Sequence, residues 1–281
     1  MISWQISSMT KAYVDTTVLT DVLLSWGNQR KTAKDALRLY ATTQLPVYAI
    51  KEFKAGPLSN FVWMHNKLVT LSSWSEALEA LQRMSRTPKR YTTSTAIQAL
   101  KLSSDSIGRL TTMDLLTKYG IQSSDKVLCN EYRLAIKSAV FKAWKKRRNV
   151  TTEVVDVLPC YREATPYDER GCIVLDPLKC VGYNECSLST KLKVRSNELK
   201  ILKDTIDKLP VKKENQRRSQ VLRQLIRKPK APMVEDNCRA LGDAYFAIFC
   251  PNDSVILTTN RSDHEPMAIA LGKKVAVPNK S

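Results

Sequence analysis

The spacing of hydrophobic and polar positions changes several times along the chain, and these changes mark short strands and longer helices. Residues 12–14 (AYV) form a short apolar run, and from Val18 onward the apolar residues recur three or four positions apart. The first pattern predicts a buried strand and the second a helix with one buried face. Asp15 stands between them, where it is also a good helix N-cap. The sequence therefore predicts a strand that ends on an aspartate, with either a structural or a functional role for that carboxylate.

A second strand is predicted to end at an acid. Residues 31–44 have the spacing of a helix, and residues 45–50 (LPVYAI) predict a short buried strand introduced by a proline. This run leads directly to Glu52. Residues 58–71 then have helical spacing with one apolar face.

The middle of the chain, residues 73–230, is predicted to be mainly helical. Helices are expected over residues 74–84, 113–119 and 125–148, and the last of these ends in the basic run KAWKKRRN. A second basic stretch lies between residues 191 and 230 and is interrupted by prolines. Two β-rich segments, EVVDVL and GCIVLD, predict a small hairpin or an irregular cap between the helices.

Alternation of strands and helices returns near the end of the chain. The segment NCRALGDAYFAIFC predicts a helix, SVILTT a strand, DHEPMAIALG a helix closed by glycine, and KVAVP a final strand. Short strands separated by helices at both ends of the chain imply an α/β fold with one parallel sheet. We expect the two halves of this core at residues 10–72 and 231–281, with residues 73–230 as a large, mainly helical, basic insertion.

Basic residues outnumber acidic ones. The 45 lysines and arginines against 27 aspartates and glutamates give a formal net charge of +18 and a pI near 9.6. This excess favours a polyanionic partner, with nucleic acid as the leading candidate and an anionic membrane surface as the weaker alternative. The candidate nucleic-acid-binding residues are Lys142, Lys145, Lys146, Arg147, Arg148, Arg217 and Arg218. A solvated helix face is the alternative for the KAWKKRRN run.

The cysteines and the hydropathy favour a cytoplasmic protein. Seven cysteines are an odd number, and the chain lacks the pattern of an export signal, so we expect reduced thiols. Four of them, Cys160, Cys172, Cys180 and Cys186, lie close together but form no CxxC pair, so a structural zinc site is only an alternative. No apolar run is long enough to span a bilayer, and no membrane partner is expected.

Three acids are predicted to meet at one edge of the sheet. Asp15 and Glu52 follow predicted strands, and Asp243 begins the apolar stretch AYFAIF. The carboxyl ends of parallel strands share one edge, and ligands bind in the crevice outside it. Several carboxylates at one site repel each other unless a cation is present, and an all-oxygen ligand set selects hard ions such as Mg²⁺ or Mn²⁺. The residues after strand 254–259 are expected at the same edge.

Four segments in this order resemble the motifs of the PIN-domain nucleases. They are VDTTVLTDVLL, VYAIKEFKAG, LGDAYFAIF and ILTTNRSDHEP, and together they cover roughly the two ends of the chain. The resemblance implies a three-layer α/β/α fold and metal-dependent hydrolysis of phosphodiester bonds, with RNA favoured and DNA as the alternative. Asp15, Glu52 and Asp243 match the metal-binding acids of the family. Either Asp263 or Asn260 supplies a fourth ligand, or the site has three acids.

The resemblance also implies roles for neighbouring residues and partners. Thr16, Thr259 and Asn260 would position the phosphate, and an inhibitor or ATPase would control the enzyme as in a toxin pair or an antiviral defence system. Arg261 stands where the family often has an acid or asparagine, which favours an alternative: a non-catalytic nucleic-acid-binding scaffold with a degenerate site. The two histidines, His65 and His264, are interpreted as core or surface side chains rather than site residues.

Overall fold

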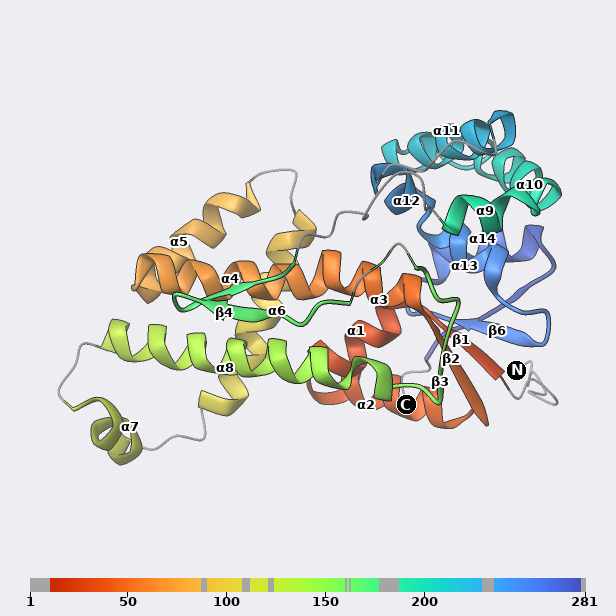
Figure 1. The fold of residues 1–281 in the computed structure, drawn as a ribbon. Coiled ribbons are helices and arrows are strands. Elements are labelled where there is room, and N and C mark those ends of the chain that lie inside the picture. Colours follow the sequence, from red (N-terminus) through yellow and green to blue (C-terminus); the bar gives the residue numbers. More distant parts are fainter. Residues whose placement is uncertain are drawn as a thin grey trace.

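The central element of the protein is a five-stranded parallel sheet with the strand order β3-β2-β1-β6-β7 (Figure 1). The computed structural model describes residues 11–86, 90–107, 112–120, 124–159, 161, 163–176, 187–228 and 235–278. The strands are β1 (Lys11–Val14), β2 (Thr42–Pro46), β3 (Glu153–Val155), β6 (Ser254–Leu257) and β7 (Lys274–Ala276). The predicted α/β class with a central parallel sheet is confirmed.

Strand β1 joins the two ends of the chain. Tyr13 on β1 is in register with Gln44 on β2 and with Ile256 on β6. Two sheet neighbours therefore come from segments more than two hundred residues apart in sequence. All four residues of β6 and the last three of β1 are buried, as expected for the middle of a parallel sheet covered on both faces.

Helices flank both sides of this sheet, which is compatible with three layers. Figure 1 shows α1 (Thr16–Leu24) and α2 (Gly27–Arg38) on one side of the strands, with α13 (Asp243–Phe249) and α14 (Arg261–Ala270) on the other. From β1 the chain proceeds to β2, whereas from β6 it proceeds to β7 in the opposite direction across the sheet. Right-handed crossovers in opposite directions place their helices on opposite faces. The direction of winding thus switches between β1 and β6.

The remaining helices form two groups beside the sheet. One group packs together beside α1 and consists of α4 (Ser59–Leu71), α5 (Trp74–Ser85), α6 (Arg90–Ile107) and α8 (Ser124–Lys146). The other packs around α13 and α14 and consists of α9 (Ser187–Lys193), α10 (Ser196–Ile206), α11 (Lys213–Arg227) and α12 (Glu235–Leu241). Helix α7 (Thr112–Tyr119) precedes α8, which a 3-10 turn (Arg147–Asn149) extends. Among the described residues, no helix has both the length and the apolar composition needed to cross a membrane.

The second predicted strand was placed too late in the sequence. Strand β2 ends at Pro46, and helix α3 (Val47–Phe53) begins at the next residue, so Glu52 lies on a helix and not at a strand end. Every residue from Val47 to Ile50 is buried. A short, continuous apolar run of this kind does not distinguish a buried strand from a buried helix, because neither face is polar. A π-helical turn (Lys54–Leu58) then connects α3 to α4.

Two further expectations are corrected. The segment EVVDVL forms no hairpin with GCIVLD; its β3 pairs with β2 as an edge strand of the main sheet. The segment GCIVLD contributes β5 (Cys172–Val174), which pairs with β4 (Tyr167–Glu169) in a separate antiparallel ribbon. The helix expected over residues 237–250 is broken at Gly242, whose φ of 45° separates α12 from α13.

Aromatic packing holds α3 against α13. The rings of Tyr48 on α3 and Tyr245 on α13 stack with their centroids 4.1 Å apart, and Phe246 meets both rings edge-on. The Tyr48 hydroxyl donates a hydrogen bond to the carbonyl oxygen of Cys238 and accepts one from the amide of Gly242. This buried contact fixes the two helices that carry Glu52 and Asp243.

Candidate active site

A cavity of about 260 Å³ lies at the carboxyl edge of the sheet, beside the end of β1. The end of a strand next to the point where the winding direction switches is where open α/β sheets bind ligands. Asp15, Glu52 and Asp243 all line this cavity, together with Thr16, Thr17, Tyr48, Lys51 and Arg239. The structure therefore brings together the three acids that the sequence singled out, from three distant segments.

Asp15 caps helix α1 and is almost fully buried, with 2% of its surface exposed. Its Oδ1 accepts a hydrogen bond from the Thr16 amide at 2.6 Å. Its Oδ2 accepts bonds from the hydroxyls of Thr17 at 2.6 Å and Thr258 at 2.8 Å. The capping role anticipated for this residue is thus present, and it coexists with a position in the cavity wall.

The hydroxyls of Thr17 and Thr258 tie the loop after β6 to the start of α1. The Thr17 hydroxyl accepts a bond from the Thr259 amide, and the Thr258 hydroxyl accepts one from the Asn260 amide, each at 3.0 Å. Each hydroxyl donates its proton to Asp15 and accepts a hydrogen bond from a backbone amide. The orientation of both hydroxyls is therefore fixed. Thr259 itself contacts this network through its backbone, and its side chain is exposed.

Glu52 points into the same network from α3. The Thr16 hydroxyl donates a hydrogen bond of 2.7 Å to its Oε2. Burial raises the pKa of Glu52 to about 8, and the carboxylates of Asp15 and Asp243 act in the same direction, while the Thr16 bond opposes them. A nearby positive charge would stabilise the ionised form of this carboxyl group and lower its pKa.

Asp243 is paired with an arginine from the middle of the chain. Its Oδ2 lies 3.0 Å from Nη2 of Arg218 on α11, and the two side chains are 20% and 11% exposed. Gly242 allows this contact, because a Cβ at that position would lie only 3.1 Å from the same Nη2 and φ there is positive. Arg218, expected to bind nucleic acid, instead neutralises one of the acids.

His264 lies between two of the acids. Its Nε2 is 3.1 Å from Oδ1 of Asp243 and 3.4 Å from Oδ2 of Asp15, and its side chain is 1% exposed. Burial lowers the pKa of His264, but Asp15 and Asp243 outweigh it and raise the value to about 10. Burial alone would raise the pKa of each aspartate, and the imidazolium of His264 reverses that effect and holds both below their usual value.

The predicted fourth ligand does not reach the cavity. Asp263 is half-buried and accepts a hydrogen bond of 2.7 Å from the Asn260 side chain, and neither residue is among those that line the cavity. Neighbouring positions on a helix face directions about 100° apart. Because His264 faces the acids, Asp263 does not. His264 was expected in the core or at the surface, and only its position one residue after Asp263 pointed to the site.

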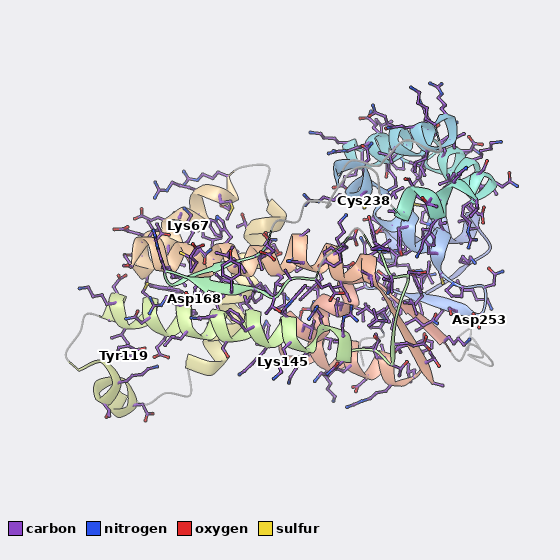
Figure 2. All side chains as sticks on the ribbon, in the orientation of Figure 1. Lys67, Tyr119, Lys145, Asp168, Cys238 and Asp253 are labelled. Atoms are coloured by element: carbon purple, nitrogen blue, oxygen red, sulfur yellow. The ribbon has the colours of Figure 1, made fainter. Side chains whose placement is uncertain are left out.

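Two cations in the cavity wall were also missed. Lys51 is 5% exposed, and its Nζ donates a hydrogen bond of 3.0 Å to the thiol sulfur of Cys238 on α12. Figure 2 labels the position of Cys238. Arg239 is exposed at the neighbouring position. Both were hidden in the sequence because no local pattern shows which side of α3 or α12 faces the acids.

The basic residues expected to bind nucleic acid fall into two groups. Lys142, Lys145 and Lys146 are exposed on α8, and Figure 2 marks the position of Lys145. Arg147 and Arg148 both pair with Glu163, and the Arg147 guanidinium lies 3.7 Å from the centre of the Trp144 ring. Arg217 is exposed on α11, and the half-buried Arg218 that follows it pairs with Asp243.

The alternative zinc site falls largely outside the described residues. Cys172 is a free, half-buried thiol on β5, and Cys160, Cys180 and Cys186 are not among the residues that the structure describes. His65 is fully buried, with its Nδ1 2.9 Å from the side-chain oxygen of Asn66, as expected for a core histidine.

The acids have the right chemistry for a hard cation but are not arranged as a preformed metal site. Among the described residues, no group of three or more His, Cys, Asp and Glu side chains is placed to hold a metal ion. Both oxygens of Asp15 are already hydrogen-bonded, and Asp243 is paired with Arg218. The hydrogen-bond partner of Glu52, Thr16, is uncharged. Of the three acids, Glu52 is therefore the one whose ionised form a bound cation would stabilise most.

Comparison with known proteins adds no family to this geometry. No protein-family model, curated protein or solved structure matches the chain. The resemblance to PIN-domain nucleases therefore rests on the quoted motifs alone.

Proposed function

We propose that the protein is a PIN-like nuclease that hydrolyses phosphodiester bonds, with RNA as the favoured substrate and Mg²⁺ or Mn²⁺ as the cofactor. The observation that carries the proposal is the convergence of Asp15, Glu52 and Asp243 on one cavity at the carboxyl edge of the sheet. Such an edge is where this class of fold binds ligands, and carboxylates are the groups that hold hard divalent ions.

Glu52 is the acid proposed to hold the ion first, and Asp243 would join it by giving up one of its contacts with Arg218 and His264. A divalent ion in this cavity would activate a water molecule and stabilise the charge that develops on the phosphate. Its positive charge would also favour the ionised form of Glu52, whose pKa is raised by burial and, to a smaller extent, by the neighbouring carboxylates. The oxygens of Asp15 accept hydrogen bonds from hydroxyls and amides. Asp15 would therefore hold Thr16, Thr17 and Thr258 in place and would not bind the ion itself.

The cations of the cavity have a separate role in this proposal. Lys51 and Arg239 line the same wall as the acids and would bind the phosphate oxygens of the substrate. Thr16 orients the Glu52 carboxylate through its hydroxyl. A controlling inhibitor or ATPase, as in a toxin pair or a defence system, belongs to the proposal through the family resemblance alone.

The test is cleavage of labelled single- and double-stranded RNA and DNA in Mg²⁺, Mn²⁺ or EDTA. We expect cleavage that needs a divalent ion and falls by at least about 100-fold in Asp243→Asn. Asp253→Asn is the matched control. Asp253 is an exposed acid in the turn before β6, at the end of this strand away from the acid cavity (Figure 2). Cleavage that persists in EDTA, or that Asp243→Asn leaves unchanged, would contradict the proposal.

A second candidate function is a non-catalytic nucleic-acid-binding scaffold with a degenerate site. The observation that favours it is the supply of positive charge by the protein itself, since His264 and Arg218 already contact Asp15 and Asp243. This candidate predicts RNA binding without cleavage in every metal, and binding that Asp243→Asn does not alter.

A further inference from the structure

A second cavity, of about 620 Å³, lies at the amino-terminal edge of the sheet, away from the acids. It is bounded by α2, by the end of α8 and by the starts of β2 and β3. Its charged lining consists of Arg30, Lys34 and Arg38 from α2 and of Lys146 from α8. No carboxylate is among the described residues that line it.

The three basic residues of α2 form a stripe along one side of that helix. They are spaced four positions apart, so they lie above one another on consecutive turns. The buried face of the same helix is formed by Ala33, Ala36 and Leu37. The stripe therefore runs beside the buried face, where it can line a concave surface rather than project freely into solvent.

The folded chain brings this stripe next to the basic end of α8. Thr43 at the start of β2 and Thr152 before β3 exchange hydrogen bonds of 2.9 Å between each amide and the other hydroxyl. This clasp fixes β3 against β2, and β3 follows directly from the end of α8. Lys146 is thereby held across the cavity from α2.

The cations of this second cavity are largely unpaired. Within the described part of the chain, the Nε of Arg30 is buried without a hydrogen-bond partner, and no described acid pairs with Lys34 or Lys146. Arg38 pairs with Asp35, but both side chains are exposed, and such a pair contributes little. Adjacent unpaired cations repel one another, and a bound anion would remove that repulsion.

We propose that this cavity binds the phosphate groups of a nucleic-acid strand, as a second contact remote from the acid cavity. Arginine and lysine are the side chains that hold phosphates, and Asn149 and Thr151 in the same lining supply uncharged donors. An open, concave site of this volume has room for a phosphate and its sugar, whereas a lipid surface is flat. The inference shares only its ligand with the proposed nuclease and requires no cleavage.

The test measures binding of a single-stranded RNA of about 20 nucleotides by fluorescence anisotropy in EDTA, over a range of salt concentrations. The variant is Lys34→Gln/Lys146→Gln, and the matched control is Lys31→Gln/Lys200→Gln, which removes two exposed lysines outside the cavity. We expect the first pair to weaken binding about 10-fold and to reduce the salt slope by about 1.4, since each phosphate contact contributes about 0.7 on a single strand. The control should leave both quantities close to those of the unsubstituted protein.

Three outcomes would overturn the inference. Equal losses in the two double variants would mean that net charge and not the cavity governs binding. Displacement of the strand by an equal concentration of adenosine monophosphate would assign the cavity to a free nucleotide. If Lys34→Gln/Lys146→Gln lost binding to phosphatidylserine vesicles but kept its binding to RNA, the cavity would be assigned to a membrane surface.

The inference and the proposed nuclease can fail separately. A protein that cleaves nothing but loses RNA affinity in Lys34→Gln/Lys146→Gln would keep this inference and contradict the nuclease. A protein that cleaves RNA with unchanged affinity in the same variant would do the reverse. Thermal unfolding of both double variants confirms that each is folded, which their exposed side chains lead us to expect.

Discussion

The acid cavity and the basic cavity occupy opposite edges of one sheet, and they handle charge in opposite ways. In the acid cavity, the carboxylates of Asp15 and Asp243 are compensated by His264 and Arg218 inside the protein. In the basic cavity, Lys34 and Lys146 are exposed and have no described acid as partner. Charges that are buried must be paired for the fold to be stable, whereas exposed charges are solvated and remain free for a ligand.

The two cavities should therefore be sensitive to mutation in different ways. The acid cavity is part of the fold as well as a candidate site, so its substitutions should change stability together with activity. The basic cavity rests on a scaffold held by other contacts, so its substitutions should change binding alone. Substitutions in each cavity test this contrast.

The largest effect is expected from His264→Ala. Removal of the imidazolium leaves Asp15 and Asp243 as buried carboxylates without their shared cation. Breaking one partner of a buried ion pair costs about 3–5 kcal/mol of unfolding free energy. Chemical denaturation of the variant measures this loss. Addition of Asp15→Asn should restore part of it, and a double variant no more stable than His264→Ala would argue against the ion pair.

A smaller loss of stability is expected from Arg218→Met. The substitution keeps the bulk of the side chain but leaves Asp243 without its 3.0 Å contact. Loss of a charged hydrogen bond at a mostly buried position should cost about 1.5–3 kcal/mol. Arg227→Met is the control at an exposed position of the same helix and should change stability by less than about 0.5 kcal/mol. Equal effects of the two variants would mean that Arg218 does not support the acid cavity.

Glu52 should make the stability of the protein depend on pH. Its pKa of about 8 in the folded state lies above the value of 4.5 that is usual for a glutamate, so the folded state binds more protons between these two values. Stability should therefore fall as pH rises from about 4.5 to about 8 and then level off. In Glu52→Gln, which keeps an oxygen acceptor for Thr16, this part of the dependence should disappear. Denaturation in EDTA across this range compares the two proteins, and parallel curves would contradict the assigned shift.

The smallest effect on stability is expected in the basic cavity. Lys34→Gln/Lys146→Gln should change the unfolding free energy by less than about 0.5 kcal/mol, because both side chains are solvated and lack acidic partners among the described residues. Thermal unfolding at low and high salt measures it. If the variant were clearly more stable than the unsubstituted protein at low salt, the cations in the cavity would repel each other more strongly than expected. A loss of unfolding free energy above about 2 kcal/mol would mean that the two cavities do not differ in their effect on stability.

Much of the fold could be predicted from the sequence, with errors at particular places. The strand before Asp15, the long helix before KKRRN and the last strand were all found where expected, because their apolar spacing is distinctive. Strand β2 was misplaced because VYAI is apolar at every position. Strand β3 was assigned to a hairpin because three residues do not specify whether their partner is near or distant in sequence.

The candidate site shows the same division. The capping role of Asp15 and the position of Asp243 before an apolar stretch were legible from local pattern. The break at Gly242 was not, because the close approach that requires glycine is made by Arg218, which belongs to another helix. The role of His264 was likewise hidden, since its contacts are to residues at the two ends of the chain.

The parallel α/β core, the chain positions of the three acids and the surplus of positive charge could all be read from the amino-acid sequence. These properties depend on composition and on the periodicity of nearby residues. The folded structure was needed to show that His264 and not Asp263 faces the acids, that Arg218 neutralises Asp243, and that the basic stripe of α2 meets the end of α8. Each of these is a contact between segments far apart in sequence, and local patterns carry no information about which distant surfaces will meet.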